Sequence, residues 1–309
     1  MTIPATRPVH TMDRLLLGDN QFFGINHMSE ERARAQALRF RDTESIVDVI
    51  EVALQEGVRT LMCTTHERIA EVCDRIRDDP ARYPGFRAYP CMPYAHKYAN
   101  AVTENGMLGA MRSFLPDDGA LDALLKGGRS LLRKDVEGLI PPLIDAEMKI
   151  FHGLRTPVIF LQNVVVDLLL GLGFDEAFAA FDRHVRERYG AEPGFITMNL
   201  PMLLDRLDTV GLENPVVCAN INAMGFRMSG GVEAYERVLA ERPFRPVAMS
   251  VFASGAIAPV PALEWIHEHA RVESIVFGAS SRSSIASTVA IARDLWGSIA
   301  APDVVQQPQ

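Results

Sequence analysis

Short apolar runs alternate with amphipathic segments along most of this 309-residue chain, and this alternation restricts the possible folds more than any other feature. Runs of this kind predict buried strands, and the longer segments between them have apolar side chains at helical spacing. The predicted strands lie at residues 15–24, 58–65, the start of 88–98, 157–163, 195–199, 215–222, 246–252 and 274–277. Such alternation is typical of a parallel sheet covered by helices.

Eight parallel strands close most naturally into a barrel, because a parallel sheet needs both of its faces covered. An open, doubly wound sheet is the alternative, but no Gly-x-Gly-x-x-Gly motif follows the first strand, since Gly18 and Gly24 lack that spacing. We therefore predict an α/β fold with a single (β/α)8 TIM-barrel domain over residues 1–309.

Residues 100–155 interrupt this rhythm, because the segment is longer than one crossover helix. We predict helices at 121–132 and 139–150, with Gly127-Gly128 and Pro141-Pro142 separating the pieces. This segment is predicted to be a helical insertion after the third strand. It either lies over the mouth of the sheet or extends the outer layer of helices.

The composition excludes several classes of partner. A formal net charge of -8 without any basic block argues against nucleic acid. The four cysteines include no C-x-x-C pair, which favours reduced thiols in a cytoplasmic protein over a disulfide scaffold or a structural zinc site. The longest apolar run, residues 158–172, is too short to span a bilayer, and the N-terminus lacks the apolar core of a signal peptide. We expect a small-molecule substrate, with no membrane partner and no prediction of oligomeric state.

Titratable side chains follow the first three predicted strands, and barrel enzymes carry their chemistry at such strand ends. A lysine beside a histidine and a phenol can form a Schiff base, act as a general acid or bind an anion. The simpler alternative for each residue is a helix cap or an ordinary ion pair. The candidate catalytic residues are Asp19, His66, Tyr94, His96 and Lys97.

Neutral amides, hydroxyls and glycines follow the later strands instead. Glycine and serine allow backbone N–H groups to approach an anion, and the helix that follows the last strand begins beside a cation, Arg282. These features predict a phosphate-binding loop after the last two strands. A serine-capped turn is the simpler alternative.

From about residue 193 to 296 the chain resembles the aldo/keto reductase superfamily. The motifs are Thr197-Met198-Asn199, Asn220-Ile221-Asn222, the run 250–256 and the run 277–285, in the order in which that family has them. The resemblance implies NADP as cofactor and hydride transfer to the carbonyl of a small, phosphorylated or acidic metabolite. The cofactor-binding residues that it implies are Asn199, Asn220, Ser254, Gly278, Ser280, Ser281 and Arg282.

The first half of the chain departs from that family, whose reductases use an Asp and a Tyr after the second strand, a Lys after the third and a His after the fourth. Here Cys63 stands where the Asp would be, no Tyr follows it, and Gln162 or Asn163 replaces the His. Lys97 fits the lysine position approximately. Carbonyl reduction then needs another phenol, Tyr94 or Tyr98, to protonate the developing alkoxide.

Three further functions stay open. The first is a lyase, aldolase or isomerase that uses Lys97 with His66 or His96. The second is an enzyme with a divalent metal held by His27, His66 and His96, although no short metal-binding motif supports it. The third is a barrel without catalysis that serves as a binding or scaffold subunit.

Overall fold

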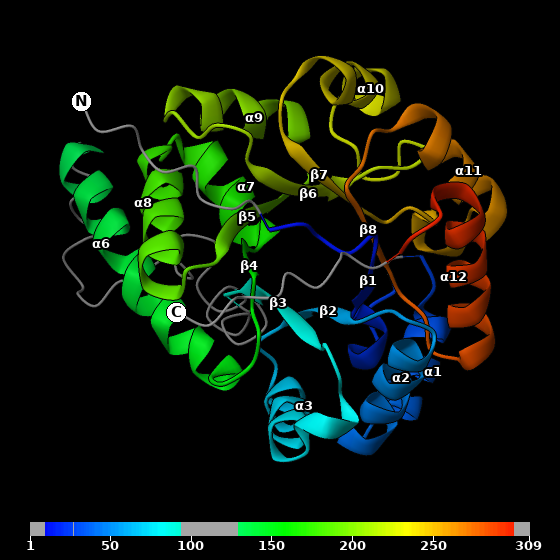
Figure 1. Ribbon diagram of the computed structural model, residues 1–309. Helices are drawn as coiled ribbons and strands as arrows, with labels where there is room; N and C mark the ends of the chain where they lie inside the picture. Colours follow the sequence, from blue (N-terminus) through cyan, green and yellow to red (C-terminus); the bar gives the residue numbers. More distant parts are fainter. Residues whose placement is uncertain (1–9, 27, 94–128, 300–309) are drawn as a thin grey trace.

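The computed structural model describes residues 10–26, 28–93 and 129–299. The strands of this part are β1 (Leu15–Gly18), β2 (Thr60–Thr64), β3 (Arg87–Met92), β4 (Val158–Leu161), β5 (Glu192–Thr197), β6 (Val216–Asn220), β7 (Arg245–Met249) and β8 (Ser274–Phe277). Each strand pairs in parallel with the next, and β8 pairs with β1, so that the sheet closes into a barrel (Figure 1). The predicted (β/α)8 TIM barrel is confirmed.

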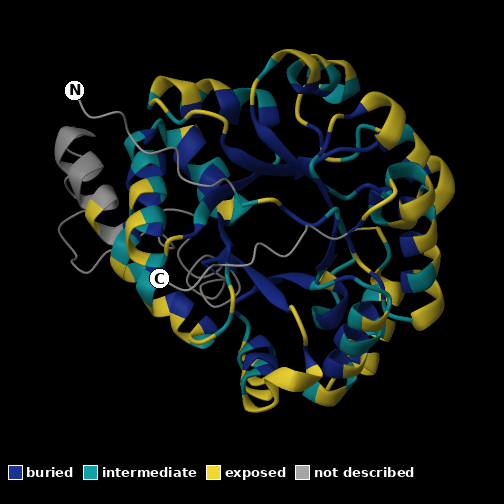
Figure 2. Ribbon diagram, in the orientation of Figure 1, coloured by how far each residue is buried: buried dark blue, intermediate teal, exposed yellow. Residues whose placement is uncertain are grey.

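Helices form a ring around this barrel (Figure 1). They are α1 (Glu30–Arg39), α2 (Thr43–Gln55), α3 (Glu67–Asp78), α6 (Arg129–Met148), α7 (Asn163–Leu172), α8 (Glu176–His184), α9 (Leu200–Thr209), α10 (Gly231–Glu241), α11 (Pro259–His269) and α12 (Arg282–Trp296). Shorter helical turns are η1 (Asn20–Phe23), η2 (Pro80–Arg82), η4 (Lys149–Phe151), η5 (Val185–Tyr189) and η6 (Ala253–Gly255). The strands are buried and the outer helix faces are exposed (Figure 2).

The core has two layers, one inside the barrel and one between the barrel and the helices. Successive side chains of a strand point to opposite faces, so Leu16 lies in the interior cluster, whereas Leu15 and Leu17 belong to the outer one. Both faces of every strand are covered, and this explains why the strands are nearly continuous apolar runs.

Ion pairs fill the end of the barrel at which the strands begin. Arg87 donates to Asp13 at 2.7 Å, and Arg245 binds both Glu192 and Glu273. These charged groups are largely buried and paired with one another. Unpaired polar groups are found at the opposite end, where the strands finish.

The structure corrects some element boundaries. Helices α1 and α7 were not predicted. In the predicted insertion, residues 100–128 lie outside the described residues. The rest contains α6, which continues through Pro141 and Pro142 instead of breaking there, and the short turn η4 that follows it. Ile140 and Ile144 are buried in the core cluster one turn apart, so packing outweighs the local preference of proline. Helix α6 lies against α8 in the outer layer (Figure 1).

Among the described helices, none has both the length and the hydropathy needed to cross a membrane.

Candidate active site

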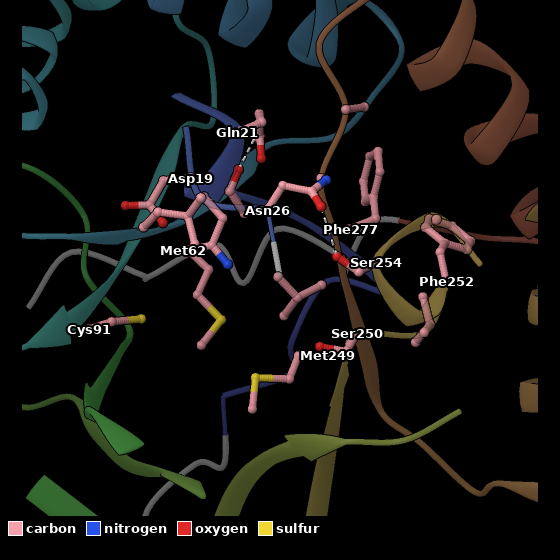
Figure 3. A pocket seen from close by; sticks show the side chains of 18 of the residues that line it. Asp19, Gln21, Asn26, Met62, Cys91, Met249, Ser250, Phe252, Ser254 and Phe277 are labelled. Atoms are coloured by element: carbon pink, nitrogen blue, oxygen red, sulfur yellow. Dashed lines mark hydrogen bonds between the residues drawn. The ribbon is translucent and has the colours of Figure 1, made fainter. Parts of the chain in front are cut away.

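A cavity of about 500 Å³ opens at the carboxyl ends of the strands (Figure 3). Its walls come from the segments that follow β1, β7 and β8, together with one face of α1. Its floor is apolar and rich in sulfur: Met62, Cys91, Ile196, Cys218 and Met249. A concave site of this size, with a mainly apolar floor and a few polar groups, has the properties of a small-molecule site.

Asp19 lies in the wall directly after β1, and only 6% of its surface is exposed. Its Oδ2 atom accepts hydrogen bonds from the Thr64 backbone N–H at 2.7 Å and from the Thr64 hydroxyl at 2.8 Å. Burial raises the pKa of this carboxyl, and the two bonds from Thr64 lower it, with burial the larger effect. Asp19 follows β1, but its carboxyl, whose pKa is elevated, therefore lies beside Thr64 at the end of β2.

Gln21 supplies an unused acceptor to the same wall. Its Nε2 donates to the Gly18 carbonyl at 2.6 Å, and this bond fixes the orientation of the amide because a carbonyl oxygen can only accept. The other amide atom, Oε1, is buried and has no hydrogen-bond partner. A Cβ on Gly278 would lie 2.9 Å from that oxygen, so the glycine leaves room for it. A ligand that donates an N–H or O–H would satisfy Oε1.

The loop that follows β7 has an unusual backbone. Three residues other than glycine have positive φ angles: Ser250 at 55°, Ala253 at 44° and Ser254 at 59°. Left-handed conformations cost energy for such residues and are concentrated at functional sites. Turns of this kind also direct backbone N–H groups toward an anion. Ser250 and Ser254 both line the cavity (Figure 3).

The loop after β8 divides its polar residues between the cavity and the helix that follows. Gly278 and Ser280 line the cavity. Ser281 caps α12 instead, since its hydroxyl accepts from the Ser284 N–H at 3.2 Å. Arg282 donates to Gln55 at 2.5 Å and lies 3.5 Å from a Glu56 oxygen, which directs its guanidinium to α2. The cation predicted for this loop is thus outside the cavity lining.

The predicted amides after β5 and β6 are used within their own loops. Asn199 caps α9 by accepting from the Met202 N–H at 3.3 Å. Asn220 donates to the Arg227 carbonyl at 3.0 Å, and neither amide lines the cavity. Both amides are therefore bonded within their own loops and lie outside the cavity lining.

His66 also has a structural role. It precedes α3, its Nδ1 accepts from the Arg68 N–H at 3.1 Å, and its ring stacks on Phe23 with 4.1 Å between the ring centroids. It does not line the cavity, so the placement does not support the predicted catalytic role. The other predicted catalytic residues, Tyr94, His96 and Lys97, lie outside the described residues, as does His27.

No group of three or more potential metal ligands occurs in the part of the chain that the structure describes. Two of the three histidines of the predicted metal site, His27 and His96, are outside that part, so the metal alternative rests on the sequence alone.

Cys63, at the position where the sequence resemblance leads us to expect an Asp, belongs to the outer cluster between the barrel and the helices. Burial raises the pKa of its thiol well above the ordinary value. The next residue, Thr64, lines the cavity and holds Asp19. The acidic group at this strand end is therefore supplied by β1 rather than by β2.

Polar cavity residues that the sequence did not suggest include Gln21, Asn26, Arg32 and Gln36. Arg32 and Gln36 belong to α1, a helix with no buried residue. A helix that buries no residue has no apolar stripe facing a core, so the sequence offered no signal for it.

Comparison with known proteins gives matches at the level of structure only. No family model and no curated protein sequence matches the chain. A presumed aldo-keto reductase from Pseudomonas aeruginosa superposes with a TM-score of 0.54 at 13% identity, covering 92% of this chain and 91% of that one. A presumed 2,5-diketo-D-gluconic acid reductase B gives 0.52 at 10% identity, with 95% of both chains covered. An aldose reductase from Giardia lamblia gives 0.50 at 13% identity, covering 93% and 89%. The chain therefore has an aldo-keto reductase-like (β/α)8 barrel fold.

Proposed function

We propose that this protein is an oxidoreductase that uses NADP to transfer hydride to or from the carbonyl carbon of a small metabolite. The observation that carries the proposal is the cavity at the carboxyl ends of the strands, which joins a buried carboxyl, Asp19, to the loops after β7 and β8. The shared fold with aldo-keto reductases makes hydride chemistry the first choice among barrel reactions, by analogy of fold.

The wall formed by the last two loops suits a nucleotide. It combines the left-handed residues Ser250 and Ser254 with Gly278 and Ser280. Backbone N–H groups and hydroxyls of such loops bind phosphate oxygens. The unpaired Oε1 of Gln21, beside Gly278, suits a donor such as a ribose hydroxyl or a carboxamide N–H. The polar groups of this wall thus match both the anionic and the hydrogen-bond-donating parts of NADP.

A reduced nicotinamide supplies the hydride when it is bound. The carbonyl oxygen of the substrate then needs a proton, and the elevated pKa of Asp19 favours a carboxyl that retains one. Lys97, His96 and Tyr94 follow β3 in the sequence and remain the predicted partners in this proton transfer. No tyrosine, histidine or lysine among the described residues lines the cavity, and burial raises the pKa of the Cys91 and Cys218 thiols that do. Asp19 is therefore the proton donor that we propose for the described part of the site.

The floor indicates the size and character of the substrate. Met62 and Met249 are flexible side chains that adapt to different shapes. Since a dinucleotide would occupy much of a 500 Å³ cavity, the space left above the floor suits a small carbonyl compound. A phosphorylated or acidic metabolite is the class that we propose.

Turnover of NADPH with a panel of small aldehydes and keto acids, followed by absorbance, tests this function. Asp19→Asn should lower kcat about a hundredfold, because it removes a proton-transferring group, and should leave NADPH affinity within about twofold. Lys97→Ala should also lower kcat. If the wild-type protein bound neither NADPH nor NADH, the proposed function would be wrong.

A further inference from the structure

We propose that Arg32, on helix α1, is the cation that binds the diphosphate of a nucleotide in this cavity, over the loop that follows β7. The inference rests on the proposed function, since it assigns a subsite within the same cavity. Arg32 thus takes the role that the sequence predicted for Arg282, whose guanidinium is directed instead to Gln55 and Glu56.

Arg32 lies next to the turn that follows β7. It lines the cavity, and its Nη1 atom lies where a side chain on Gly255 would begin, since a Cβ there would be 2.7 Å away. Gly255 has a φ angle of 93° and ends η6, the turn that contains Ala253 and Ser254. The guanidinium therefore lies directly above the strained part of the β7 loop.

The polar groups of this cavity have hydrogen-bonding capacity that the described residues do not use. The Arg32 guanidinium has no hydrogen bond or ion pair with any residue in the described ranges, whereas Arg34, two positions along α1, pairs with Glu30 at 3.2 Å. Gln36, one turn beyond Arg32 on the same helix face, also lines the cavity, and its Oε1 is buried without a partner. A cation in the same cavity as two unpaired amide oxygens, those of Gln21 and Gln36, fits a ligand that has both phosphates and hydroxyls.

The charges of the cavity also locate the anion. Asp19 and Arg32 are the charged residues among its described lining, and they come from the β1 end and from α1 respectively. A diphosphate is attracted by a guanidinium, and the described lining holds no other cation, so it binds on the Arg32 side, against the N–H groups of the β7 loop. This arrangement leaves the Asp19 side for the reacting carbonyl.

Helix α1 can carry such a residue because its attachment to the barrel does not depend on its own apolar side chains. It buries no residue and contacts η1. Gly24 permits the contact, because a Cβ there would lie 2.8 Å from the Ala33 carbonyl oxygen. Substitution of Arg32 should therefore alter binding without affecting the fold.

The test is calorimetric titration of NADPH, NADH, ADP and pyrophosphate into the wild type, Arg32→Ala and Arg32→Lys. Arg32→Ala should weaken all four ligands by about tenfold to hundredfold, because each loses a charge-assisted contact to the same diphosphate. Arg32→Lys should retain part of the affinity. Arg34→Ala and Arg282→Ala are matched controls and should bind like the wild type, and melting temperatures verify that every variant is folded.

Wild-type affinity for NADPH after Arg32→Ala would overturn the inference, and so would a loss confined to NADPH, since that result would assign Arg32 to the extra phosphate. The absence of wild-type binding to all four ligands would also overturn it. Arg32-dependent binding of ADP and pyrophosphate without NADPH turnover would support the subsite and contradict the proposed oxidoreductase. NADPH turnover with unchanged binding by Arg32→Ala would support the function and overturn the subsite.

Discussion

Two halves of the barrel mouth carry similar polar residues and use them differently. After β5 and β6, the amides of Asn199 and Asn222 bind backbone groups of their own loops. Around β1, α1 and β7, the Oε1 atoms of Gln21 and Gln36 and the guanidinium of Arg32 face a cavity without protein partners among the described residues. Residue type at a strand end therefore does not identify a ligand contact. What identifies it is hydrogen-bonding capacity that the fold leaves unused.

The backbone follows the same division. The left-handed residues Ser250, Ala253 and Ser254 all belong to the β7 loop at the cavity. The β6 loop includes one such residue, Arg227, together with glycines, and Asn220 and Asn222 hold it in place. Strain beside the cavity and internal bonding away from it are what we expect if the β1, α1 and β7 side binds a ligand and the β5 and β6 side supports the barrel.

Removal of a supporting amide should give the largest effect on stability. Asn222 is fully buried, and its Oδ1 accepts from the Phe226 N–H at 2.9 Å and from the Met224 N–H at 3.2 Å. Asn222→Ala leaves these backbone groups unpaired, so we expect the free energy of unfolding to fall by about 2–3 kcal/mol. Chemical denaturation followed by circular dichroism measures this. A stable variant that had lost NADPH binding would instead identify Asn222 as a cofactor ligand. The two sides of the barrel mouth would then not differ in how they use their amides.

The contact between α1 and the barrel comes next. Gly24→Ala combines a left-handed φ of 65° with a Cβ that would meet Ala33 and Ala37, so we expect a loss of about 1–2 kcal/mol and weaker NADPH binding as α1 moves away. Gly173→Ala is the matched control: its φ is 69°, but nothing lies within 4 Å of the added Cβ. It should lose only the part of the stability that the left-handed backbone costs, less than Gly24→Ala loses, and bind NADPH normally. Equal NADPH affinity for the two variants would argue against a ligand-binding role for α1.

Gln21→Met should affect ligand binding more than stability, the opposite of what we expect for Asn222→Ala. The substitution removes an unpaired buried oxygen along with one hydrogen bond to Gly18, so unfolding free energy should change by less than about 1 kcal/mol. NADPH affinity should fall about fivefold, the effect of one lost hydrogen bond. Denaturation and titration of the same samples separate the two effects. A large destabilisation with unchanged affinity would place Gln21 among the structural amides.

The smallest expected effect is a dependence of stability on pH. Burial raises the folded-state pKa of Asp19 above its ordinary value of 3.8, so the folded chain loses stability as the pH rises through the elevated pKa. Asp19→Asn lacks this loss, and its melting temperature should exceed that of the wild type at neutral pH. The difference should shrink below pH 3.8, where the wild-type carboxyl is protonated in both states. A wild type that was more stable than Asp19→Asn at neutral pH would show that the carboxylate is stabilised in the site.

The barrel could be predicted because each strand is buried on both faces and covering helices such as α2 and α3 have one apolar face. Helix α7 was missed because residues 158–172 form one apolar run, in which a strand and a buried helix have the same composition. Helix α1 was missed for the opposite reason, because it buries no residue and so has no core-facing apolar stripe. The fold thus follows from apolar periodicity, and the two errors occur where that periodicity is absent.

The site was less predictable. Asp19, Ser254, Gly278 and Ser280 do line the cavity, because their positions follow from the strand ends. The sequence does not reveal which partner a polar side chain selects, and Arg282 pairs with α2 although its motif indicates an anion site. Such choices depend on tertiary contacts between residues far apart in the chain.

Hydrogen–deuterium exchange with and without saturating NADPH tests the difference between the two halves most directly. We expect slower exchange at residues 250–257 and 278–284 and in α1, with no change in the loops at 198–202 and 221–230. Protection confined to the loops after β5 and β6, with none at α1 or the β7 loop, would contradict it.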